Sequence, residues 1–174
     1  SELDERLLAT PAIALERCRE VAADMAETAV SALKISLSCL QDDSPHLAAS
    51  VREKEEKTDY YEDILGTYLV KLSEKQISSS DSAEAAKLLK MIGDFERISD
   101  HAVNISKSAE EMQEKELTFT EAAVSEMEVI TSAVNEILDL SLKAFLSDDL
   151  ETASMVEPLE QVIEQLKEQL RTRH

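Results

Sequence analysis

The chain has 174 residues, of which 37 are acidic and 18 basic, so its formal net charge is -19. This charge disfavours binding to a nucleic-acid backbone or directly to an anionic lipid surface, and it favours metal cations or a basic partner. Two glycines, three prolines and 3% aromatic residues provide little material for the turns and packing of a β-rich fold. The composition therefore predicts an all-α protein with a substantial core.

The first predicted helix follows a short charged linker, residues 1–10. Thr10 and Pro11 mark its start, and it ends near residue 40. Cys18 and Cys39 fall on this one helix, about 31 Å apart at 1.5 Å per residue, which is too far for a disulfide. Free thiols indicate a reducing compartment. The sequence has no signal peptide, and no apolar run approaches the roughly 20 residues of a membrane span.

Two further long helices are predicted in the middle of the chain. Ser44 caps the second helix, which covers residues 45–75. A serine-rich break follows, and Asp81 with Glu84 resembles a capping box that opens a third helix at about 82–115. The break is short, so these two helices are expected to be antiparallel neighbours.

A fourth and a fifth predicted helix complete a bundle of five. Thr118 and Glu121 form a capping box for the fourth helix, and Asp148 or Asp149 caps the fifth. Pro158 lies inside the predicted fifth helix and should kink it or delay its start.

An internal repeat relates the two ends of the chain. A shift of 105 residues without gaps pairs identical residues and aligns one helix–break–helix segment with another. The paired positions include Leu33 with Leu138, Ser36 with Ser141, Leu37 with Leu142, Val51 with Val156, and Glu55 with Glu160. We therefore expect one complete three-helix unit, 11–115, and a partial second unit of two helices, 116–174. The exposed apolar faces of the last two helices would then need a partner chain, which makes a homo-oligomer one possibility.

Acidic side chains on the third helix form half of a candidate metal site. Glu96 and Asp100 lie one turn apart and in line with Gly93 and Asn104. The glycine could let a partner approach. Asn104 could serve as a ligand, although such a residue more often faces solvent.

The other half of this site is predicted on the second helix. Glu55 and Glu62 project into its apolar stripe and Asp59 onto the edge, where a carboxylate must be paired or neutralised. Because the helices are antiparallel, Glu55 and Asp59 should meet Glu96 and Asp100 at about the same height. Converging carboxylates repel unless cations or protons neutralise them. Oxygen ligands between bundle helices suit Mg, Mn or Fe(II).

Three other interpretations remain open at this point. Each acidic pair could be a solvated surface, since such spacings arise by chance in an acidic chain. Arg97 could neutralise the acids in a metal-free charge cluster, which would make the chain a helical protein-interaction module. A ferritin-like redox enzyme is disfavoured because the sequence contains no Glu-x-x-His pair. His101 has no second histidine nearby, so hydrogen bonding suits it better than metal ligation.

Residues 95–105, Phe-Glu-Arg-Ile-Ser-Asp-His-Ala-Val-Asn-Ile, resemble the L-E-R-I-G-D-H-A-x-N-I signature of the PhoU family. Glu55-x-x-x-Asp59 matches the other acidic motif of that family. The family consists of repeated three-helix units whose acidic motifs bind multinuclear metal clusters. The resemblance thus implies a non-enzymatic regulatory domain that binds divalent or trivalent ions of the Fe, Mn, Mg or Zn class. The resemblance also implies that Glu55, Asp59, Glu96 and Asp100 are metal ligands, with Glu62 less certain.

The second repeat departs from this pattern. Glu160-x-x-x-Glu164 stands where Glu-x-x-x-Asp is expected, Lys167 replaces the position of Glu62, and Pro158 interrupts the helix. Glu160 and Glu164 are therefore weaker ligand candidates, and only one complete cluster is expected.

The N-terminal segment adds an expectation about context. Residues 3–16 are similar to the segment that links the membrane domain of bacterial Na⁺/phosphate cotransporters to their C-terminal PhoU-like domain. This similarity implies a domain on the cytoplasmic face of the membrane that regulates phosphate uptake, with the parent transporter domain as partner. The alternative within the family is a free-standing regulator that acts with a phosphate-signalling protein.

Overall fold

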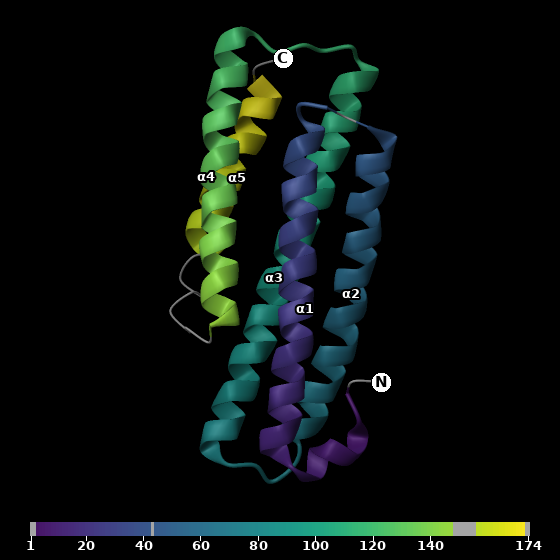
Figure 1. Cartoon of the computed structure of the whole chain (residues 1–174), viewed down its shortest axis with the longest axis vertical. Helices are drawn as coiled ribbons and strands as arrows, with labels where there is room; N and C mark the ends of the chain where they lie inside the picture. The colour runs from purple at the N-terminus through teal and green to yellow at the C-terminus, as the bar shows by residue number, and fades with distance from the viewer. Residues whose placement is uncertain (1–2, 43, 148–155, 173–174) are drawn as a thin grey trace.

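The computed structural model describes residues 3–42, 44–147 and 156–172, and within these ranges it contains helices and no strand (Figure 1). The all-α prediction is confirmed. Each long helix runs antiparallel to the preceding one, and α4 and α5 lie together beside α1 and α3 (Figure 1). The elements in chain order are η1 (Glu5–Ala9), α1 (Pro11–Cys39), α2 (Pro45–Ser73), α3 (Ser79–Glu114), α4 (Glu121–Leu146) and α5 (Val156–Thr172).

Helix α1 is the centre of the bundle because its small and branched residues are buried around most of its circumference. Its buried positions include Ala14, Val21, Met25, Ala29 and Leu37. These residues pack against α2 and α3, and α4 covers part of the remaining surface. Cys18 and Cys39 are buried and unbonded to each other, as their separation along α1 requires.

Capping hydrogen bonds fix where α2, α3 and α4 begin, and two of the three differ from the prediction. Ser44 caps α2 as expected, since its hydroxyl accepts the N–H of His46. For α3 the cap is Ser78, which accepts the Asp81 N–H at 3.0 Å, so the helix starts three residues before the predicted box. The cap of α4 is likewise Thr120 rather than Thr118.

The two remaining predicted start signals have different outcomes. Pro11 occupies the first turn of α1, but the Thr10 side chain makes no capping hydrogen bond. Pro158 is the third residue of the described part of α5, Val156–Thr172. Whether Pro158 kinks this helix or delays its start depends on the residues before Val156 and stays a prediction. The predicted caps Asp148 and Asp149 lie outside the described residues.

Helices α1 and α4 meet at equivalent positions of the predicted repeat. Leu33 and Leu138 are both fully buried. The next pair of residues, Lys34 and Asp139, forms an ion pair between the two helices. Contact between equivalent positions on antiparallel helices is the arrangement expected of two units related by an approximate two-fold axis.

The apolar faces of α4 and α5 differ from each other in exposure. Val124, Val129, Leu140 and Leu146 on α4 are exposed, in agreement with the expectation for that helix. The apolar side chains of α5 are instead buried: Leu159, Ile163, Leu166 and Leu170. The prediction of an exposed apolar face on α5 is therefore wrong, because α3 and α4 cover it. None of the described helices combines the length and apolar character that crossing a membrane requires.

Candidate metal centre

Five carboxylates from α2 and α3 form a group that we call the acidic ladder: Glu55, Asp59, Glu62, Glu96 and Asp100. The α2 members recur at intervals of four and three residues and the α3 members at four, which places each set on one face of its helix. The break between the helices turns the chain so that the two faces meet. Thr58 and Leu65, both fully buried, hold the same part of α2 against the bundle.

Three members of the acidic ladder come together closely enough to share one ion. Asp59, Glu62 and Glu96 each offer one carboxylate oxygen, and these oxygens all lie within 4.8 Å of one another. Glu62 and Glu96 are half-buried, while Asp59 is exposed. The three residues line an open hollow of about 510 Å³ between the helices, together with Asp63 and Gly66. A ligand could therefore reach the carboxylates from solvent.

Burial and like charge raise the pKa of Glu96 to about 7. Loss of solvent is the largest cause, followed by a hydrogen bond with the Glu62 carboxyl group and repulsion from Glu62, Asp100 and Asp59. The pKa of Glu55 is also raised, first by burial and then by a hydrogen bond with Asp59 and by the charges of Asp59 and Asp100. These mutual effects connect all five members of the ladder.

Within the part of the chain that the structure describes, no cationic side chain neutralises the acidic ladder. Among the residues that the structure describes, none of the five carboxylates lies within 4.0 Å of a Lys, Arg or His nitrogen. Arg97, the candidate counter-ion in the sequence, pairs with Asp94 at 2.6 Å and with Glu160 at 3.0 Å instead. The metal-free charge cluster centred on Arg97 is therefore not formed.

The donor set of the ladder fits a hard cation. Asp59, Glu62 and Glu96 supply only carboxylate oxygens, which suit Mg, Mn or Fe(II) better than Zn, whose sites favour His and Cys. Glu55 and Asp100 extend the same surface and could hold a second ion or a ligating water. A cation would remove the repulsion that raises the pKa of Glu96.

Three weaker ligand candidates lie away from the ladder. Glu160 pairs with Arg97, and Glu164 lies 3.6 Å from the Lys167 ammonium group. Asn104 is exposed and lines a separate groove between α3 and α5.

Two other residues near the ladder also differ from the sequence-based expectations. A Cβ atom at Gly93 would meet nothing within 4 Å, so no close helix approach depends on that glycine. Asp63 lines the hollow but was not predicted. Its position four residues after Asp59, and thus on the same helix face, is the signal that could have identified it.

The fold and this site define an all-α bundle domain with a cluster of carboxylates between two antiparallel helices. A family model described as "PhoU domain" matches residues 22–109, just over half of the chain. The chain therefore belongs to the PhoU domain family. The matched segment contains the whole of α2 and all five members of the acidic ladder. Searches of curated proteins and of solved structures found no match.

Proposed function

We propose that this chain is a non-enzymatic, metal-binding regulatory domain of phosphate homeostasis, attached to a sodium-dependent phosphate transporter at the cytoplasmic face of the membrane. Membership of the PhoU domain family supports a regulatory role in phosphate homeostasis. The observation that carries metal binding is the convergence of Asp59, Glu62 and Glu96 oxygens within 4.8 Å, in a ladder that pairs with no cationic side chain among the described residues.

Metal binding at this site would act on the packing of two helices. Asp59 and Glu62 belong to α2, and Glu96 belongs to α3. Without a cation these carboxylates repel one another across the interface, whereas a shared cation attracts both sides. A bound ion therefore supplies positive charge that fastens α2 to α3, and by linkage it stabilises the folded domain.

The N-terminal segment offers a route from this site toward a preceding domain. The Tyr68 hydroxyl group donates a hydrogen bond to the Asp4 carbonyl oxygen at 2.8 Å, and Lys71 pairs with Glu5 at 2.5 Å. Leu8 in η1 is buried against the core. The linker thus rests on α2, the helix that carries three ladder residues, so a movement of α2 on metal binding would reach the linker.

Elemental analysis of protein purified without chelators tests the metal site. We expect bound Mg, Mn or Fe in the natural protein and its loss in Glu62→Gln/Glu96→Gln, because these amides keep the size of the side chains but remove two anionic donors. The matched control is Glu53→Gln/Glu114→Gln, which removes one exposed acid from each of the same two helices. Equal metal content in all three proteins would exclude the site.

Coprecipitation with the membrane domain of a Na⁺/phosphate cotransporter tests the proposed partner. We expect the metal-loaded domain to be retained and the metal-stripped domain to be retained less, because metal binding sets the packing of α2. Failure of both forms to bind would reject the transporter assignment. Equal retention of both would reject regulation by metal while leaving the partner assignment in place.

A further inference from the structure

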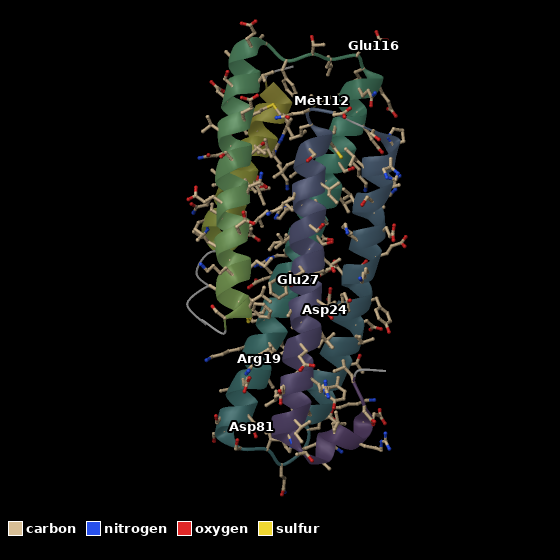
Figure 2. All side chains as sticks on the ribbon, viewed as in Figure 1. Arg19, Asp24, Glu27, Asp81, Met112 and Glu116 are labelled. Carbon is tan, nitrogen blue, oxygen red and sulfur yellow. The ribbon has the colours of Figure 1, made fainter. Side chains whose placement is uncertain are left out.

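A basic groove lies between the C-terminal part of α3 and α5, apart from the acidic ladder. It has a volume of about 490 Å³ and is lined by Lys107 and Lys115 from α3 and by Lys167 and Arg171 from α5. Glu111 is the one acidic residue among the described residues that line it. In Figure 2 the groove lies toward the end of the bundle where Met112, another lining residue, is labelled.

The charge of this groove contrasts with that of the whole chain. The sequence holds 18 basic residues and has a net charge of -19, yet four cationic side chains line this one groove. Lys107, Lys115 and Arg171 form no ion pair within the described part of the chain. Because the Debye length is about 8 Å at physiological ionic strength, exposed acids farther away than this are largely screened from a ligand in the groove, whereas Glu164, 3.6 Å from Lys167, is not.

Lys167 forms a long ion pair with Glu164 at 3.6 Å, and its own side chain is only 22% exposed. Its ammonium nitrogen lies 3.1 Å from Nδ1 of His101 and 3.6 Å from the nearest carboxylate oxygen, that of Glu164. Partial burial makes a charge costly unless an anion is near. An anionic group in the groove would add a closer charge-assisted contact to the long one that Glu164 provides.

We propose that the basic groove binds a small soluble molecule that carries two or more phosphate groups, such as an oligophosphate or a nucleoside polyphosphate. Its volume falls in the range of roughly 300–1,000 Å³ that is usual for small-molecule sites. Lysine and arginine groups form charge-assisted hydrogen bonds to phosphate oxygens. Met112, Leu117 and Leu170 give the groove an apolar wall against which a base or another apolar group could rest.

The position of the groove gives such binding a structural consequence. Its cations come from α3, in the first repeat unit, and from α5, in the second. A polyanion held by both helices would fasten the two units together. This inference does not depend on the metal site, since none of the five ladder carboxylates lines the groove.

Isothermal titration with sodium pyrophosphate, tripolyphosphate and ATP tests the proposal. The protein is first stripped of metal and then freed of chelator, because chelators are themselves polyanions. We expect saturable binding that weakens as salt is raised from about 50 to about 200 mM, as for other contacts between cations and phosphates. Binding should persist in Glu62→Gln/Glu96→Gln, so that failure of the metal site does not affect this result.

Paired variants locate the binding. Lys107→Gln/Arg171→Gln removes one groove cation from each helix and should weaken binding about tenfold or more, given the strength of charge-assisted hydrogen bonds. The matched control, Lys87→Gln/Lys143→Gln, removes an exposed lysine of α3 and a cation from the last turn of α4. It should change the affinity less than about twofold, since distant exposed charges are screened. Equal weakening in both variants would overturn the proposal.

Hydrogen exchange on the natural sequence provides a test that needs no variant. Tripolyphosphate should slow amide exchange in residues 104–117 and 167–171, the segments that line the groove. The absence of saturable binding by all three soluble anions would overturn the proposal. Phosphatidylglycerol vesicles and an acidic peptide serve as comparison ligands. Binding to either of these without binding to the three soluble anions would also overturn the proposal.

Discussion

At the scale of single residues, Glu96 is the member of the acidic ladder whose pKa is raised to about 7. Burial and the neighbouring carboxyl groups of Glu62, Asp100 and Asp59 raise this pKa. A folded-state pKa above the ordinary glutamate value of 4.5 means that the folded protein binds this proton more tightly than the unfolded chain does. Without metal, Glu96 therefore destabilises the fold progressively as pH rises from about 4.5 to about 7.

We predict that Glu96→Gln removes this pH dependence from the metal-free protein. The amide cannot ionise, so the variant should gain stability relative to the natural sequence as pH is raised from 5 to 8. Urea unfolding at both pH values in EDTA measures the difference. Glu114→Gln, at an exposed position of the same helix, is the control and should show no such gain. A constant difference in unfolding free energy between Glu96→Gln and the natural sequence would contradict the prediction.

The sequence named all five members of the ladder but ranked them differently from the geometry. The motifs favoured Glu55, Asp59, Glu96 and Asp100 over Glu62, whereas the three oxygens that meet within 4.8 Å belong to Asp59, Glu62 and Glu96. Spacing along one helix shows which side chains share a face. It does not show how far two helices are rotated about their axes, and that rotation decides which carboxylates meet.

At the scale of single elements, the end of α3 shows a local conflict between conformation and residue type. The N–H of Leu117 bonds to the Met112 carbonyl oxygen and that of Glu116 to the Gln113 carbonyl oxygen, the pattern of a Schellman motif. This motif places Glu116 in the left-handed region with φ 54°, where a side chain is unfavourable. Figure 2 labels both Met112 and Glu116 at this helix end.

We predict that Glu116→Gly stabilises the domain. Relief of the left-handed conformation contributes about 1–2 kcal/mol, and the greater freedom of glycine in the unfolded chain costs about 0.5–1 kcal/mol. The net gain should be about 0.5–1 kcal/mol in urea unfolding. Glu114→Gly changes the last residue of α3, where no left-handed conformation is relieved, and should instead lose stability, by up to about 1 kcal/mol. A loss of stability in both variants would show that residue 116 does not need glycine.

The starts of the helices were less predictable than their existence. Ser78 and Asp81 are both good capping residues, as are Thr118 and Thr120. Sequence patterns favoured the candidates followed by a glutamate three residues later, but the observed hydrogen bonds use Ser78 and Thr120. The direction from which the chain enters the bundle decides between such neighbours, and that direction is a tertiary property.

At the scale of the whole molecule, composition and the 105-residue shift predicted a helical bundle with a repeat, while the contacts of α5 were not predictable. Its apolar face is buried rather than exposed. The basic groove joins Lys107 of α3 to Lys167 and Arg171 of α5, about 60 residues later in the sequence. The periodicity of a single helix cannot predict this contact between α3 and α5, because the contact depends on how two helices far apart in the sequence pack together.

The cooperative unfolding of the whole molecule determines how much metal binding should raise the free energy of unfolding. The ladder joins α2 to α3, both of which pack on the central α1, so a ligand that binds only the folded ladder adds to the stability of the entire cooperative unit. At a metal concentration of 100 times Kd the gain is about 2.7 kcal/mol. For a chain of this size it corresponds to a rise in Tm of about 5–10 °C.

We therefore predict that Mn or Mg raises the Tm of the chelator-treated domain, measured by circular dichroism at 222 nm. The Tm of Glu62→Gln/Glu96→Gln should not rise with metal, because the two helices no longer share the anionic donors. The metal-free Tm of this variant should equal or exceed that of the natural sequence. Glu53→Gln/Glu114→Gln should respond like the natural sequence. Identical Tm values with metal and with EDTA would mean that the ladder does not couple metal to folding, whatever metal content elemental analysis finds.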